Sequence, residues 1–138
     1  MTIDSSTPPS ESLPAATALA LAFLDAMERR DLDAARRFLA ADFTMCFPGG
    51  VAMRSLAELV ERSRKRYRSV GKTFERLDHC RTQSVEVVYC SGRLHGVWLD
   101  GRAFSDIRFI DRFELADGLI RRQDVWNDMG EALADRSS

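Results

Sequence analysis

The feature that most constrains the fold is a run of four strand-like segments in the second half of the chain. These segments are rich in β-branched and aromatic residues, which favour strands. They span residues 74–81, 85–98, 102–115 and 119–127. The last three are separated by Asp100-Gly101 and Asp117-Gly118, and Asp-Gly is a typical hairpin turn. We therefore expect a meander of long antiparallel strands.

Helical patterns precede this meander. We expect one helix from near Ser12, a second over residues 32–41, a short strand over residues 43–47 and a third helix from Ser55 to about Ser69. Asp31 is a typical N-cap residue, and Ser55 with Glu58 forms a capping box. Helices followed by a run of strands predict an α+β fold in which the helices cover one face of the sheet.

The length of 138 residues fits a single domain. Residues 1–11 are rich in Ser, Thr and Pro and predict a disordered tail, so the domain is expected over residues 12–138. The net charge of −1 argues against nucleic-acid binding, although basic residues cluster between positions 62 and 68. We interpret this cluster as a complement to the negative end of the third helix.

The sequence gives no sign of a membrane or a metal partner. No apolar run approaches the roughly 20 residues that a membrane span needs, and no secretory signal is recognisable. Cys46, Cys80 and Cys90 stand at spacings that match no metal site. We expect reduced thiols and a cytoplasmic location, with a Cys80–Cys90 disulfide as the alternative.

Two stretches carry a family resemblance. FLDAMERRDLDAARRFLAADFTM and GRAFSDIRFIDRFELADGLIRRQDVWND resemble the helical start and the terminal strands of the nuclear-transport-factor-2-like superfamily. That superfamily includes SnoaL-like polyketide cyclases, limonene epoxide hydrolase and ketosteroid isomerase. The resemblance covers residues 15–130 and implies a cone-shaped, cystatin-like antiparallel sheet packed against three N-terminal helices. It also implies a pocket for a small, mostly apolar molecule, and in many members a homodimer.

The resemblance to ketosteroid isomerase places Asp111 where that enzyme has an oxyanion-holding Asp. Phe23 and Phe47 stand at the positions of its tyrosine and its catalytic base. Since phenylalanine neither gives nor takes a proton, we do not expect the steroid-isomerase mechanism.

The SnoaL-like cyclases suggest a different site, because they pair a His with an Asp. His95 with Asp111 or Asp124 is the expected acid–base pair, and Arg93 the expected holder of an anion. Limonene epoxide hydrolase gives a partial match, in which Arg93 is present and His95 replaces an acid. Its last-strand acid corresponds either to Asp124 or to the position of Val125. The expected pocket lining is Phe23, Met27, Phe47, Phe109, Phe113 and Trp126.

Two functions follow from this resemblance. The first is an acid–base isomerase, cyclase, dehydratase or hydrolase that acts without a cofactor or metal on a small apolar carbonyl or cyclic substrate. The second is a non-catalytic ligand-binding or dimerisation domain. Convergence of Arg93, His95 and Asp111 in one cavity would favour the enzyme. We also predict a homodimer through the outer face of the sheet, because residues 85–98 carry apolar side chains on both faces.

Overall fold

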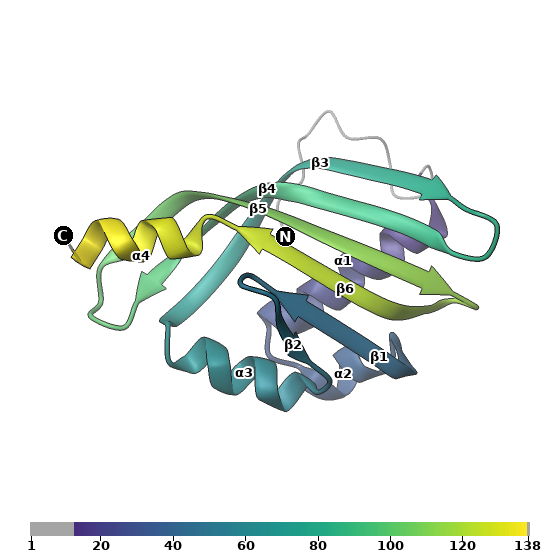
Figure 1. Cartoon of the computed structure of the whole chain (residues 1–138), viewed down its shortest axis with the longest axis horizontal. Coiled ribbons are helices and arrows are strands. Elements are labelled where there is room, and N and C mark those ends of the chain that lie inside the picture. Colours follow the sequence, from purple (N-terminus) through teal and green to yellow (C-terminus); the bar gives the residue numbers. More distant parts are fainter. Residues whose placement is uncertain (1–12, 138) are drawn as a thin grey trace.

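The computed structural model describes residues 13–137, so the tail predicted over residues 1–11 lies outside the described part. Six strands form one curved, open sheet in the order β2-β1-β6-β5-β4-β3 (Figure 1). The elements are α1 (Ala15–Glu28), α2 (Leu32–Arg36), β1 (Leu39–Phe47), β2 (Val51–Met53), α3 (Leu56–Arg64), β3 (Tyr67–Arg81), β4 (Glu86–Trp98), β5 (Ala103–Ala116), β6 (Leu119–Asn127) and α4 (Met129–Ser137). The predicted α+β class is confirmed.

The predicted meander forms the larger part of the sheet. β3, β4, β5 and β6 pair antiparallel in sequence order. Asp117 and Gly118 both have positive φ, as a two-residue type I′ turn requires. β1 then pairs with β6 in parallel, and β2 folds back on β1. The sheet is therefore mixed rather than wholly antiparallel.

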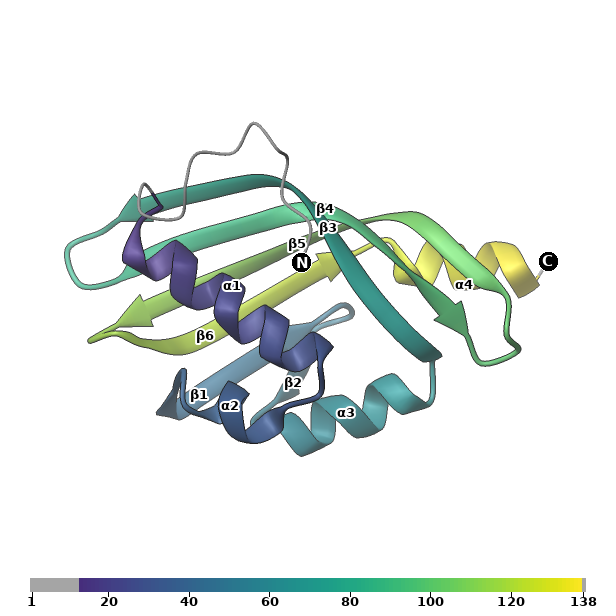
Figure 2. The ribbon, with the colours of Figure 1, turned by 180° about the vertical axis from the view of Figure 1, so that it is seen from behind.

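The first three helices lie at one face of the sheet, where Figure 2 shows α1 laid across the strands. Two of them are shorter than the sequence predicts. α2 ends at Arg36 and α3 ends at Arg64, because the residues that follow join β1 and β3. Pairing with neighbouring strands overrides local helix propensity there. The terminal helix α4 was not predicted.

Two glycines of β4 allow β3 to bend sharply. A Cβ atom at Gly92 would overlap the carbonyl oxygen of Thr73, and one at Gly96 would overlap that of Ser69. Both contacts lie beside irregularities in the β3–β4 register. The backbone of β3 therefore approaches β4 more closely than a side chain would permit, and the sheet curves at these points.

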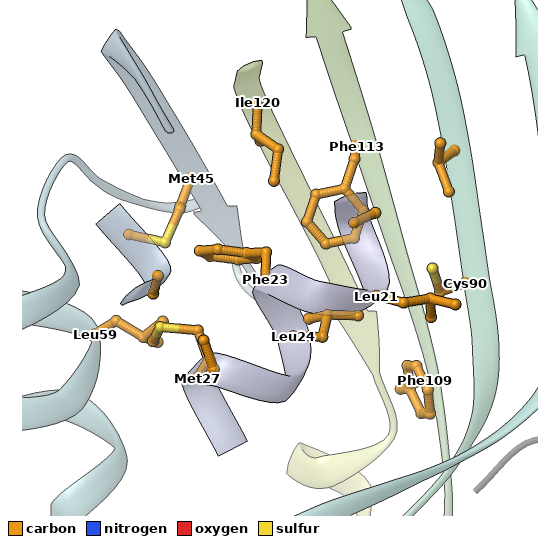
Figure 3. Packing of buried hydrophobic residues seen from close by; sticks show 14 of the residues in the cluster. Leu21, Phe23, Leu24, Met27, Met45, Leu59, Cys90, Phe109, Phe113 and Ile120 are labelled. Atoms are coloured by element: carbon orange, nitrogen blue, oxygen red, sulfur yellow. The ribbon is translucent and has the colours of Figure 1, made fainter. Parts of the chain in front are cut away.

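The core fills the space between α1 and the sheet. Phe23 of α1 meets Phe43 and Phe113 edge-on, with ring centroids 6.3 and 6.0 Å apart. Figure 3 shows Phe23 at the centre of this packing, with Met27 on the same helix. A single aromatic side chain thus joins the helix to β1 and β5 and fixes the distance between helix and sheet.

Candidate functional site

An open cavity lies between the inner face of the sheet and helices α1 and α3. Apolar side chains from all three parts wall it, including Phe23, Met27, Leu59, Phe74 and Phe109. Its empty space, counted up to and including the opening, is about 1030 Å³. An apolar cavity with a few polar groups is typical of a small-molecule site.

The main polar feature of the cavity is the carboxyl group of Asp111 on β5. Asp111 is only 1% exposed, and its Oδ2 atom has no hydrogen-bond partner among the described residues. The ammonium group of Lys72 on β3 lies 3.8 Å from this oxygen. The same ammonium group lies 5.4 Å from the centre of the Phe109 ring. A carboxyl group and a cation therefore share an otherwise apolar part of the cavity.

Burial raises the pKa of Asp111 above its ordinary value, while the nearby Lys72 and Gln123 side chains act in the opposite direction. A buried carboxylate loses its hydration, and the neutral acid is favoured for that reason. A carboxyl group whose pKa moves toward neutrality is well suited to exchange protons with a ligand. Asp111 therefore has the environment of a proton-transfer group.

Sequence reasoning missed two members of this group, Lys72 and Gln123. Gln123 of β6 is buried in the cavity wall, and its Oε1 atom has no partner among the described residues. Lys72 alternates along β3 with Val70 and Phe74, which also line the cavity. That alternation was the available signal, but the expected third helix ran to Ser69 and left Lys72 outside any strand.

Arg93 and His95 do not join Asp111, and this expectation is corrected. Leu94 lines the cavity, so its neighbours along β4 point to the other face of the sheet. Arg93 forms an ion pair with Glu75 at 3.3 Å. His95 is exposed, pairs with Gly71 across the β3–β4 ladder and is absent from the cavity wall. Alternate residues of each strand do share a face, as expected. In β5 the odd-numbered residues face the cavity, whereas in β4 the even-numbered residues do.

Asp124 and Trp126 also lie on the outer face, contrary to expectation. Both carboxylate oxygens of Asp124 bond to Arg122 at 2.8 Å. Trp126 is 53% exposed. Val125 lines the cavity instead, which decides between the two alternatives for the last strand. A shift of one residue reverses the face of a strand, so sequence alignment alone could not settle this point.

Most of the expected aromatic and apolar lining is found at the cavity. Phe23, Met27, Phe47 and Phe109 all belong to its wall. Phe113 is fully buried in the core against Phe23 and does not reach the cavity.

The thiol group nearest to Asp111 is that of Cys90, and its environment makes it unreactive. Cys46, Cys80 and Cys90 are all free. Cys90 pairs with Asp111 in the sheet, and burial together with that carboxylate raises the pKa of Cys90 to about 12. Because the thiolate is the nucleophilic form, Cys90 stays unreactive near neutral pH.

Residues 13–137 contain neither a metal-binding cluster nor a membrane-spanning helix. No group of three or more His, Cys, Asp or Glu side chains within that range is arranged to hold a metal ion. Among the same residues, no helix has both the length and the apolar character that a membrane span requires.

The exchange of Lys72 for Met should raise the pKa of Asp111 further, because the cation beside the carboxyl group would be lost while the burial remained. Titration of the Asp111 carboxyl carbon by NMR would measure this shift. Lys72→Arg keeps the positive charge and should leave the titration closer to that of the wild type. An unchanged titration in Lys72→Met would show that the ammonium group does not act on Asp111.

Comparison with known proteins decides the family. The SnoaL-like domain matches residues 20–123 of the chain. The chain belongs to the SnoaL-like domain family. Its cone-shaped fold is that of nuclear-transport-factor-2-like proteins. No curated protein matches the sequence closely enough to count as a relative.

Solved structures share the SnoaL-like fold at low sequence identity. A protein of unknown function from Burkholderia pseudomallei has 14% identity and a TM-score of 0.72, covering 88% of this chain and 97% of its own. A candidate polyketide cyclase from Xanthomonas campestris has 21% identity and a TM-score of 0.69, covering 87% and 95%. TerC, co-crystallised with polyporic acid, has 14% identity and a TM-score of 0.73, covering 91% and 100%. Identities this low establish the fold.

Proposed function

We propose that this SnoaL-like protein is an acid–base enzyme acting on a small, largely apolar carbonyl compound. The observation that carries the proposal is the environment of Asp111. Its carboxyl group faces an apolar cavity, lacks a hydrogen-bond partner at Oδ2 and has a raised pKa. A buried polar atom without a partner is costly unless a ligand supplies one.

The geometry suggests a proton transfer beside a carbonyl group. The Asp111 carboxylate would take a proton from the carbon next to the carbonyl, and the electron pair would move onto the carbonyl oxygen. Lys72, whose ammonium group lies 3.8 Å from Asp111, would stabilise the negative charge on that oxygen. Asp111 would then return the proton, to the same carbon or to another one. The remaining wall would position the apolar part of the ligand.

The bicyclic ketone 2-tetralone is a suitable probe for this reaction. In D₂O, the protein should accelerate the replacement of its C1 protons by deuterium, as measured by ¹H NMR. The rate should increase as the pH rises through the pKa of Asp111, because the carboxylate is the base. Exchange no faster than in buffer alone, despite saturable binding of the ketone, would contradict the enzymatic role.

A binding function is the second candidate, and one observation favours it. Arg93, His95 and Asp124 all lie outside the cavity, so the His–Asp pair expected from the SnoaL-like cyclases does not form in its wall. The relative TerC was co-crystallised with polyporic acid, which supports a small-molecule ligand for either function. Binding of 2-tetralone without exchange would identify the protein as a ligand-binding domain.

We also propose that the protein forms a homodimer through the outer face of the sheet. Tyr89, Ile110 and Trp126 are 38%, 42% and 53% exposed there. Ile110 and Trp126 are direct neighbours across β5 and β6. A second copy would remove this apolar patch from water.

The wild type should therefore be dimeric at micromolar concentration in multi-angle light scattering. The double change Ile110→Lys and Trp126→Lys should give monomers, because it places charges within the apolar patch. Leu99→Lys is the control, since Leu99 is 47% exposed but lies in the β4–β5 turn. A monomeric wild type would exclude this interface.

A further inference from the structure

Two arginines line the cavity at the junction between α3 and β3. Arg62 lies in the last turn of α3, and Arg66 follows one turn later. Both line the cavity together with Ser63 and Tyr67, and both are half-buried. The Tyr67 hydroxyl group and the Ser63 hydroxyl group are hydrogen-bonded at 3.0 Å. The wall at this end of the cavity is therefore polar and cationic.

Neither guanidinium group has an acidic partner in the part of the chain that the structure describes. Within residues 13–137, ion pairs occupy many other arginines, but none includes Arg62 or Arg66. Burial, followed by the charge of Arg62, lowers the pKa of Arg66. Two like charges therefore repel each other in a partly desolvated position. The repulsion between the two charges is unfavourable, and an anion that lies between them would offset it.

The acidic residues of the cavity are already engaged elsewhere. Asp25 pairs with Arg29 at 3.0 Å, and Asp111 lies beside Lys72. Glu28 accepts a hydrogen bond from the backbone amide of Lys72. Arg30 also lines the cavity, with its guanidinium bonded to the carbonyl oxygen of Met27. The charges of Arg62 and Arg66 are thus left for a ligand.

We propose that Arg62 and Arg66 bind a carboxylate of the ligand, so that the preferred substrates are apolar ring compounds with one acidic group. This inference rests on the proposed use of the cavity for a small molecule. A guanidinium group offers paired N–H donors that match the two oxygens of a carboxylate. The ring would lie against Phe23, Met27 and Phe109, and its reactive carbonyl would reach Asp111.

The helix dipole offers another explanation for basic residues here, because cations are favourable at a helix C-terminus. Arg64 separates the two explanations. It occupies the same last turn of α3, but it is exposed, pairs with Glu61 and lies outside this cavity wall. A dipole effect would involve Arg64 as much as Arg62, whereas ligand binding would not involve Arg64.

Naphthalene-2-carboxylate and naphthalene-2-carboxamide are matched probes, since they have nearly the same shape and differ in charge. Isothermal titration calorimetry with the full chain should show tighter binding of the carboxylate, by about tenfold or more, which corresponds to roughly 1.4 kcal/mol. Arg62→Gln and Arg66→Gln should each remove most of this preference and leave binding of the carboxamide unchanged. Arg64→Gln should retain the wild-type preference. Circular dichroism would verify that each variant is folded.

Equal affinity for the two probes, or failure of both to bind, would overturn the proposal. An equal loss in Arg64→Gln would also overturn it, because the effect would then be general electrostatics. The proposed role of Asp111 has a separate test. Absence of deuterium exchange in 2-tetralone would contradict that role, and this neutral ketone does not need the arginines. A carboxylate preference without exchange would leave the anion site in place and remove only the chemistry.

Discussion

Replacement of Asp111 by Asn should reduce the rate of deuterium exchange in 2-tetralone by about 10²- to 10⁴-fold, the usual contribution of a general base. Asparagine keeps the size and shape of the side chain but does not take up a proton near neutral pH. The cavity wall is otherwise unchanged, so the affinity for the ketone should fall much less than the rate. Single-turnover exchange rates and a binding titration would separate the two effects.

Two variants serve as controls for this experiment. His95→Ala and Asp124→Asn change residues that the sequence favoured as catalytic, but that the structure places outside the cavity. Both should leave the exchange rate close to that of the wild type. A large loss of rate in His95→Ala, with full rate in Asp111→Asn, would reverse the assignment.

Replacement of Asp111 by Asn should also alter the pH dependence of stability. Because burial raises the pKa of Asp111 in the folded state, the native protein retains this proton at pH values where the unfolded chain has lost it. The free energy of unfolding should therefore fall as the pH rises from the ordinary carboxyl pKa through the raised one. Asp111→Asn lacks this proton and should lose that part of the decline. Urea unfolding of both proteins between about pH 4 and pH 8 would measure the difference.

Gly92→Ala should lower the free energy of unfolding by about 3 kcal/mol or more, because overpacking against backbone is not relieved by rotation of a side chain. The new methyl group would overlap the carbonyl oxygen of Thr73 and lie 3.0 Å from the amide nitrogen of Glu75. β3 would have to move away from β4 at the bend that shapes the cavity. We therefore expect a lower melting temperature, together with weaker binding of cavity ligands.

Gly130→Ala is the matched control for this substitution. Gly130 lies in α4, and a Cβ atom there would meet nothing within 4 Å. Alanine is more favourable than glycine in a helix by about 1 kcal/mol, so this variant should be as stable as the wild type or slightly more so. Equal stability of Gly92→Ala and the wild type would show that the close approach of β3 to β4 is not required.

The sequence by itself determined the fold class and the inner face of several elements. Alternation and Asp-Gly turns predicted the three antiparallel strands from β4 to β6, and the segments 101–128 and 23–45 carried the family resemblance. Alternation along the strand grouped Asp111 with Phe109 and Phe113, and the family resemblance implied that this group faces the cavity. The strand and helix predictions depend on local periodicity, which a single strand or helix expresses by itself.

Tertiary structure alone decided which residues meet around Asp111. The parallel pairing of β1 with β6, the early end of α3 and the start of β3 at Tyr67 all depend on contacts between distant segments. These contacts bring Lys72 and Gln123 to Asp111, and they place Arg93, His95, Asp124 and Trp126 on the outer face. Periodicity shows which residues of one strand share a face. It does not show which face of each strand is turned toward the common cavity, because the register between strands sets that orientation.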